Sequence, residues 1–256
     1  MLKLIIIDSK IIMHHWITFY TIKVLLIMSL SAMIKGYLFR KNRMPNVLYS
    51  MQRYLQHNSI VPCITTEDGR VNSCMDEDKV IATLSACPTF TNRIFKPKVR
   101  MWYDILVYDY QFGWIPVNIK STTTTTSDNT GNLAMCVYAY TDCCLDLYSP
   151  CHNGAMSRLL IDKLQARQFN TNKHKDYYFI VINKSEPGDI IINSVKGLQE
   201  LTPNINNLPF QVMWKKNRNY TYKPIEENVQ MLLSALRRPA PSWKESFMSD
   251  IRSMNL

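Results

Sequence analysis

The sequence predicts one α/β or α+β domain that follows an apolar N-terminal segment. Segments with apolar residues at helical spacing alternate along the chain with short runs of β-branched and aromatic residues. Elements that alternate in this way build a sheet covered by helices. The length of 256 residues and the 46% hydrophobic content suffice for a substantial core and exclude a disordered chain.

Residues 1–43 form a hydrophobic extension in which Trp16–Ile34 carries one charge over 19 residues. A run of this length matches a transmembrane helix, and the basic residues after it would leave the rest of the chain in the cytosol. Two other interpretations stay open: the true start is Met28 or Met44, which makes the upstream residues an extension without a role, or the run is a helix of the core. We place the functional domain at residues 44–256.

The first part of this domain is predicted to contain two helices separated by a hairpin. Residues 46–57 place apolar side chains on one helical face. The apolar run Ile60–Thr65 and the segment Val71–Ser73 flank the turn residues Glu67–Gly69, as in a β-hairpin. Asp76–Ala86 opens with three acids, which suit the first turn of a helix because a helix N-terminus carries partial positive charge.

The clearest strand signal in the chain is a second hairpin. Ile105–Tyr110 is a β-branched and aromatic run, Gly113 marks a turn, and Trp114–Ser121 is the partner strand. The segment Thr122–Asn132 that follows is a polar low-complexity run, and Leu133–Tyr140 fits either a strand or a helix.

The rest of the chain alternates between helices and strands in the same way. The pattern predicts helices at Ala155–Gln168, Glu226–Leu236 and Trp243–Met254, and strands at Tyr177–Asn183, Asp189–Val195 and Phe210–Trp214.

The composition indicates a polyanionic partner. The net charge of +10 is spread over both halves of the chain, which favours a folded face that binds nucleic acid or a membrane surface. With only 7 glycines, the chain has no Walker A or dinucleotide-binding motif. The 7 cysteines lack zinc-site spacing and follow no secretory signal of ordinary layout, so we expect free thiols and a cytoplasmic protein.

Polar side chains are predicted to converge at one end of the second hairpin. Alternation along a strand places Asn118 and Lys120 on one side and the apolar Val117 and Ile119 on the other, which belongs in the core. The hairpin brings Asp104 close to the polar side. Carboxylate and amide oxygens are ligands for Mg²⁺, and a lysine beside them stabilises charge that develops on a phosphate.

The residues around this hairpin resemble a known family. WYDILVY, the turn and IPVNIKST resemble the core of the PD-(D/E)xK nucleases, in the form found in type II restriction endonucleases of the EcoRV and ScaI types. ITTEDGRVNSCMDEDKVIATL is similar to the segment that leads into their first core helix. The resemblance covers residues 59–126. It implies a restriction-endonuclease-like core, a central mixed β-sheet flanked by helices, and a Mg²⁺-dependent endonuclease, with Mn²⁺ as a substitute, that cleaves double-stranded DNA as a homodimer.

The resemblance also implies roles for individual residues. Asp104 matches the metal-binding aspartate, Lys120 matches the catalytic lysine, and Glu77 matches an acid that completes the metal site in some members. Asn118 stands at the second acidic position and is the main departure, because an amide oxygen ligates a metal without adding negative charge. Either Glu77 or Asp109 supplies the missing charge, or catalysis is weak or lost.

Two other segments are candidates for DNA contact. Residues 214–223, WKKNRNYTYK, interleave cations with aromatic side chains, which suits phosphate contacts combined with stacking. The threonine run after the hairpin offers hydroxyls to a DNA backbone. A solvated basic loop and a flexible surface loop are the alternatives. The candidate DNA-binding residues are Thr122, Thr123, Lys215, Lys216, Arg218 and Tyr220.

The leading hypothesis is therefore a Mg²⁺-dependent DNA endonuclease of the restriction type, from a bacterium or a large DNA virus with an AT-rich genome. A DNA-binding protein that has lost hydrolysis is the alternative, because Asn118 replaces an acid. A membrane-anchored protein of unknown role is a third hypothesis, and it depends on Trp16–Ile34 alone.

Overall fold

The computed structural model describes residues 21, 23, 44–58, 60, 69–204, 209–237 and 245–254. The chain divides into two compact units, Met1–Arg43 and Met44–Leu256. The apolar segment Trp16–Ile34 lies outside the described residues except for Thr21 and Lys23, which are helical. Among the helices of the described residues, none is long and apolar enough to cross a bilayer.

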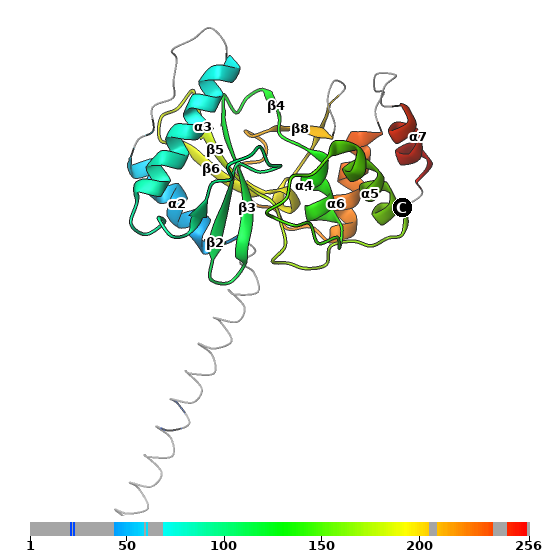
Figure 1. The fold of residues 1–256 in the computed structure, drawn as a ribbon, viewed down its shortest axis with the longest axis horizontal. Helices are drawn as coiled ribbons and strands as arrows, with labels where there is room; N and C mark the ends of the chain where they lie inside the picture. The colour runs from blue at the N-terminus through cyan, green and yellow to red at the C-terminus, as the bar shows by residue number, and fades with distance from the viewer. Residues whose placement is uncertain are drawn as a thin grey trace, which may run out of the picture. The chain divides into compact units, whose positions relative to one another are not determined.

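A mixed sheet forms the centre of the second unit (Figure 1). Within the described residues it has five strands in the order β1-β2-β3-β5-β6. β2 and β3 form an antiparallel hairpin, β5 runs parallel to β3, and β6 runs antiparallel to β5. The parallel pair requires a long crossover connection between β3 and β5. The strands are β1 (Ile94–Phe95), β2 (Ile105–Asp109), β3 (Gly113–Thr122), β5 (Tyr178–Asn183) and β6 (Ile190–Ser194).

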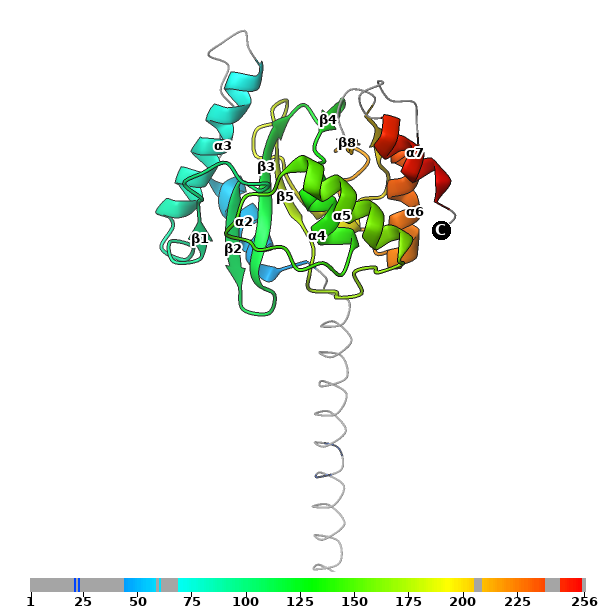
Figure 2. The same cartoon turned by 45° about the vertical axis from the view of Figure 1, so that its right-hand side comes forward.

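Helices cover both faces of this sheet (Figures 1 and 2). One face packs against α2 (Asn46–His57) and α3 (Gly69–Ala86). The crossover helices α4 and α5 pack on the other face together with α6, α7 and a small second sheet, β4-β8-β7. This architecture confirms the predicted mixed α/β class, with a mixed sheet flanked by helices. The elements of the second face are α4 (Leu133–Tyr140), α5 (Asn153–Gln165), α6 (Ile225–Leu236), α7 (Glu245–Ser253), β4 (Ser127–Asn129), β7 (Thr202–Pro203) and β8 (Phe210–Met213).

β3 pairs with β2 on one edge and with β5 on the other. Its side chains alternate between buried and partly exposed, as predicted. Val117 and Ile119 are fully buried in the core beneath α2 and α3. Asn118 and Lys120 alternate with them and keep part of their surface exposed. The second predicted hairpin is therefore confirmed, and its polar side is free to line a cleft.

The helix α3 starts earlier than the pattern indicated. It begins at Gly69, so the predicted strand Val71–Ser73 is wrong, and the acids from Asp76 onward lie in the middle of the helix rather than in its first turn. The buried face of α3 repeats every four residues and begins with two polar side chains, Asn72 and Asp76, before the apolar Val80 and Leu84. Because two residues on the buried face are polar, the apolar residues of α3 alone do not show the helical spacing over its first two turns.

The low-complexity segment Thr122–Asn132 contains a short strand and leads into a helix. Its residues Ser127–Asn129 form β4, which pairs with β8. Leu133–Tyr140, which fitted either structure, is the helix α4. The side chain of Asn132 caps it by accepting a hydrogen bond from the backbone N–H of Met135 at 2.8 Å.

Asp109 is a structural residue of the hairpin turn. Its Oδ1 accepts hydrogen bonds from the N–H groups of Gln111 and Phe112 at 2.8 and 3.2 Å, and its Oδ2 accepts one from Val47 at the start of α2 at 3.1 Å. Asp109 lies at the opposite end of β2 from Asp104. It therefore does not supply charge to a site at Asp104, and that alternative from the sequence is wrong.

We expect Asp109→Ala to destabilise the protein by roughly 2–4 kcal/mol, because buried N–H groups at the turn and at α2 lose their acceptor. Urea denaturation monitored by circular dichroism measures this change. The exposed Asp250 on α7 provides the control, since Asp250→Ala should cost about 0.5 kcal/mol or less. Equal effects of the two substitutions would contradict the structural role of Asp109.

Candidate active site

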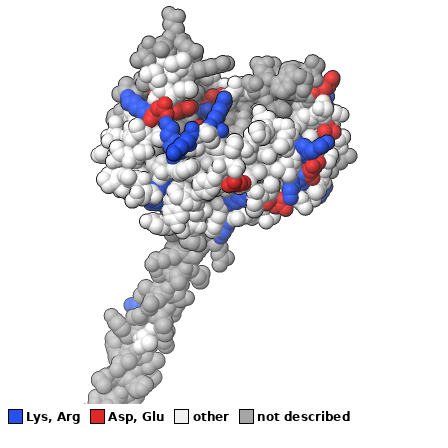
Figure 3. Space-filling view, viewed as in Figure 1, with Lys and Arg blue, Asp and Glu red and all other residues white. Residues whose placement is uncertain are grey.

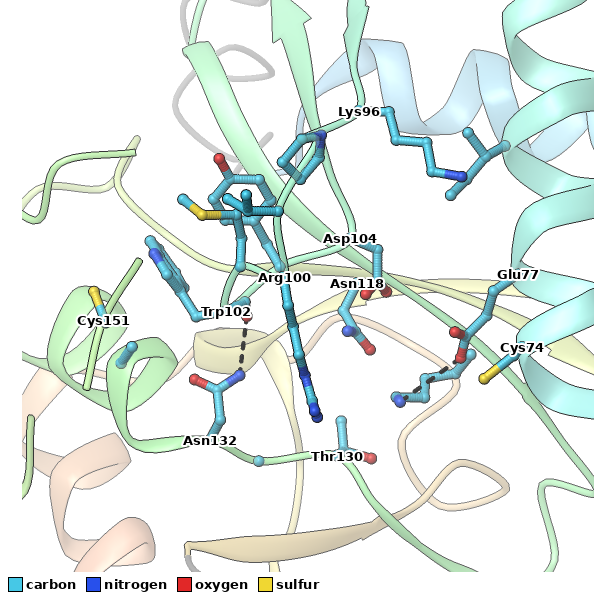
Figure 4. Close-up of a pocket in the computed structure, with 18 of the residues that line it drawn as sticks. Cys74, Glu77, Lys96, Arg100, Trp102, Asp104, Asn118, Thr130, Asn132 and Cys151 are labelled. Carbon is cyan, nitrogen blue, oxygen red and sulfur yellow. Dashed lines mark hydrogen bonds and ion pairs between the residues drawn. The ribbon is translucent and has the colours of Figure 1, made fainter. Parts of the chain in front are cut away.

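A cleft of about 1140 Å³ opens beside the start of β2 (Figure 4). One wall comes from α3, a second from the connection between β1 and β2, and a third from the N-terminal ends of α4 and α5. Asp104, Asn118 and Lys120 line it together with Glu77. The structure thus brings all four candidate catalytic residues into one cavity.

Asp104 is fixed to β3 by two hydrogen bonds. Its backbone N–H donates to the carbonyl of Val117 at 3.0 Å, and its Oδ2 accepts from the N–H of Ile119 at 2.7 Å. Burial raises the pKa of Asp104, and the Ile119 N–H and the charge of Lys120 oppose this effect. The side chain is held rigidly beside Asn118, and the two face Glu77 across the cleft in Figure 4.

Asn118 presents an acceptor that the protein leaves unused. Its Oδ1 is buried and has no hydrogen-bond partner among the described residues. A buried acceptor without a partner costs about 1–3 kcal/mol. An oxygen without a hydrogen-bond partner, lying beside Asp104 and Glu77, is suited to bind a metal cation, because a cation accepts electron density from oxygen. The donor set of two carboxylates and an amide oxygen is one that Mg²⁺ prefers.

Glu77 and Lys120 face each other from α3 and β3. Their Oε1 and Nζ atoms are 3.9 Å apart, and each side chain is 23% exposed. Burial raises the pKa of Glu77 to about 7; Lys120 lowers it, whereas Asp104, Asp128 and Asp78 raise it further. The Glu77 carboxyl group therefore exchanges its proton near neutral pH, although an exposed glutamate is fully ionised there.

Asp76, which the sequence did not single out, holds α3 against the sheet. It is fully buried, and its Oδ2 accepts a hydrogen bond from the Ser121 hydroxyl at 2.5 Å. The ammonium of Lys184 lies 3.9 Å from the same oxygen. Because Glu77 is the next residue, this contact sets the direction in which Glu77 faces. The acids Asp76 and Glu77 therefore make contacts between α3 and the sheet. Their place in the middle of α3 means that the dipole at the helix N-terminus does not explain why acids stand there.

The connection between β1 and β2 adds three cations to the cleft. Lys96, Lys98 and Arg100 line its wall, and Lys96 pairs with Asp78 of α3 at 2.8 Å. Sequence reasoning missed them, although the alternating cations of KPKVR are a visible signal just before Asp104.

The candidate DNA-binding segments lie elsewhere. Thr122, Thr123, Lys215, Lys216, Arg218 and Tyr220 are all absent from the lining of the cleft. The structure places the two segments next to each other, because the N–H of Lys215 donates to the carbonyl of Thr124 at 2.8 Å. Trp214 is fully buried, so the expectation that it stacks on a base is wrong.

Two of the four cations in this basic segment are paired with acids. Arg218 forms two hydrogen bonds with the carboxylate of Asp189, and Lys216 pairs with Glu200 at 2.8 Å. Lys223 donates to the carbonyl of Leu198. These contacts give Lys216, Arg218 and Lys223 a structural role.

The cysteines of the described residues are free thiols, as the sequence predicts. Within the same ranges, no group of three His, Cys, Asp or Glu side chains gathers in a metal-binding arrangement. A metal in the cleft would therefore depend on Asn118 as its third protein ligand. Comparisons of the chain with protein-family models, with curated proteins and with solved structures found no match.

The raised pKa of Glu77 predicts how the stability of the folded protein changes with pH. The folded chain holds this proton up to about pH 7, against about 4.5 for an ordinary glutamate, so stability is lost as the pH rises through that window. The substitution Glu77→Gln removes this loss of stability at rising pH. We expect it to stabilise the metal-free protein by roughly 1–3 kcal/mol at pH 8 and by little at pH 5.

Thermal unfolding in EDTA across this pH range measures the difference. The matched control is Asp162→Asn, at an exposed position on α5, which should leave the pH profile unchanged. A Glu77→Gln variant whose melting temperature parallels that of the wild type from pH 5 to pH 8 would contradict the raised pKa.

Proposed function

We propose that this protein is a Mg²⁺-dependent endonuclease of the type II restriction type, which hydrolyses phosphodiester bonds in double-stranded DNA. The observation that carries the proposal is the convergence of Asp104, Asn118, Lys120 and Glu77 in one cleft lined by further cations. Metal-binding oxygens next to a lysine are the groups that phosphodiester hydrolysis needs. The resemblance of residues 59–126 to the PD-(D/E)xK nucleases supports the same reaction.

Asp104, Glu77 and Asn118 would hold the metal. The unused Oδ1 of Asn118 and the two carboxylates fit a hard divalent cation, and Mn²⁺ accepts the same ligands. When bound, Mg²⁺ supplies Lewis acidity that polarises a phosphoryl oxygen and lowers the pKa of water.

The protein side chains position the substrate and stabilise charge. Lys120 extends from a rigid central strand, so its ammonium can stabilise negative charge that develops on the phosphate oxygens. The Asn118 amide orients water beside the phosphorus. Water adds to phosphorus and the bond to the 3′ oxygen breaks, which leaves a 5′-phosphate and a 3′-hydroxyl, the outcome that the family resemblance implies.

A DNA-binding protein without hydrolytic activity is the second candidate. The cleft holds an asparagine where the resemblance implies an acid, and Glu77 already lies 3.9 Å from Lys120. Fewer negative charges weaken binding of a divalent cation. Metal binding therefore separates the two candidates.

We expect Lys120→Ala to reduce DNA cleavage at least about 100-fold, because the developing charge loses its stabilising cation. Supercoiled plasmid incubated with Mg²⁺ or Mn²⁺ and analysed for nicked and linear products measures this. Lys173→Ala, which removes a charge from an exposed loop, should cleave like the wild type. Uncut DNA with the wild type, or equal cleavage by the Lys120→Ala variant, would refute the proposed reaction.

Asn118→Asp should bind Mn²⁺ at least about tenfold more tightly than the wild type, because it adds a carboxylate to the ligand set. Isothermal titration measures the affinity, with the exposed Asn219→Asp as control. For the wild type the affinity should rise from pH 6 to pH 8, since Glu77, with a pKa of about 7, must lose its proton to bind. Failure of both proteins to bind Mn²⁺ favours the second candidate.

A further inference from the structure

The basic rim of the cleft is formed by Lys96, Lys98 and Arg100 of the connection between β1 and β2. Lys98 and Arg100 are exposed and line the cleft. Among the described residues neither forms an ion pair, whereas Lys96 and Lys120 are each paired with a carboxylate of α3. Two unpaired cations therefore stand at the entrance of a cavity whose base is acidic.

The direction of Arg100 is visible in Figure 4. Its side chain extends past Asn118 toward Thr130 and Asn132, which lie just before α4. The guanidinium thus lies near the wall formed by Thr130 and Asn132. A planar group with several N–H donors in this position is suited to the oxygens of a phosphate.

The opposite wall adds positive potential. Asn132 and Asn153 line the cleft at the N-terminal ends of α4 and α5, where the backbone dipoles leave partial positive charge. Figure 3 shows Lys and Arg side chains gathered beside acidic ones between α3 and β4 on this face. Cations on the rim and acids at the base form a pattern that attracts a polyanion while it leaves room for a metal.

We propose that Lys98 and Arg100 hold the DNA backbone, each on a phosphate that neighbours the one at Lys120. This binding site rests on the proposed function for its ligand, double-stranded DNA, and it replaces the basic segment 214–223 as the main DNA contact. Two of the four cations of that segment, Lys216 and Arg218, are paired with Glu200 and Asp189, so they gain less energy by releasing counterions from DNA. The other two, Lys215 and Lys223, do not line the cleft.

The test is the salt dependence of DNA binding. A fluorescent duplex is titrated with protein in EDTA between 50 and 200 mM salt, so that binding is measured without cleavage. Lys98→Ala/Arg100→Ala should weaken binding roughly 10- to 60-fold near 100 mM salt and reduce the slope of log K against log salt by about 1.8, since two phosphate contacts are lost. Arg100→Lys in the otherwise unchanged protein should keep the slope.

Two double variants serve as comparisons. Arg158→Ala/Arg252→Ala removes the same charge from exposed positions on α5 and α7 outside the cleft, and should change the affinity less than threefold. Lys215→Ala/Lys216→Ala tests the segment that the sequence favoured. The proposal is overturned if Lys98→Ala/Arg100→Ala binds like the wild type, or if either comparison variant loses as much affinity.

The outcomes also separate this proposal from the proposed function. If the wild type binds DNA through Lys98 and Arg100 but leaves it uncut with Mg²⁺ and Mn²⁺, the binding site stands and the nuclease proposal fails. If the wild type does not bind the duplex at all, both fail. Circular dichroism melts of each variant exclude loss of folding as the cause.

Discussion

The central position of β3 is the constraint on which the cleft depends. The strand pairs with β2 on one edge and with β5 on the other, so its backbone cannot shift without breaking two ladders. Val117 and Ile119 are buried beneath α2 and α3, and this burial commits Asn118 and Lys120 to the opposite face. A slip of one residue would exchange the two sets. The hydrogen bond from the Ile119 N–H then fixes Asp104 to the same strand.

Electrostatics links this geometry to the proposed chemistry. Burial raises the pKa values of Glu77 and Asp104, so the metal-free cleft is a costly place for negative charge. A divalent cation would relieve that cost, and the cations on the rim suit the phosphates of a ligand. The side chains that give the net charge of +10 are therefore not equally available to bind a polyanion. In residues 214–223, Lys216 and Arg218 are paired with acids, whereas Lys98 and Arg100 line the cleft and have no ion-pair partner among the described residues.

The elements that could be predicted from the sequence are those whose signal is local. The hairpin of β2 and β3 was predictable because β-branched runs flank a glycine turn, and α2 because its apolar residues lie on one face. α3 was predicted too short, since Asn72 and Asp76 occupy its buried face. α4 remained ambiguous because it is buried on nearly all sides, and a uniformly apolar segment has no period from which to distinguish helix from strand.

The sequence by itself determined the alternation along β3, and with it the pairing of Asn118 with Lys120 and the return of Asp104 to their side. These follow from strand geometry and a short turn. Only the tertiary structure decided that Glu77 faces Lys120, because that depends on the buried contact between Asp76 and Ser121, 45 residues apart. It also decided which cations keep their charge available, because pairing partners such as Asp189 come from distant strands and sequence proximity does not reveal them.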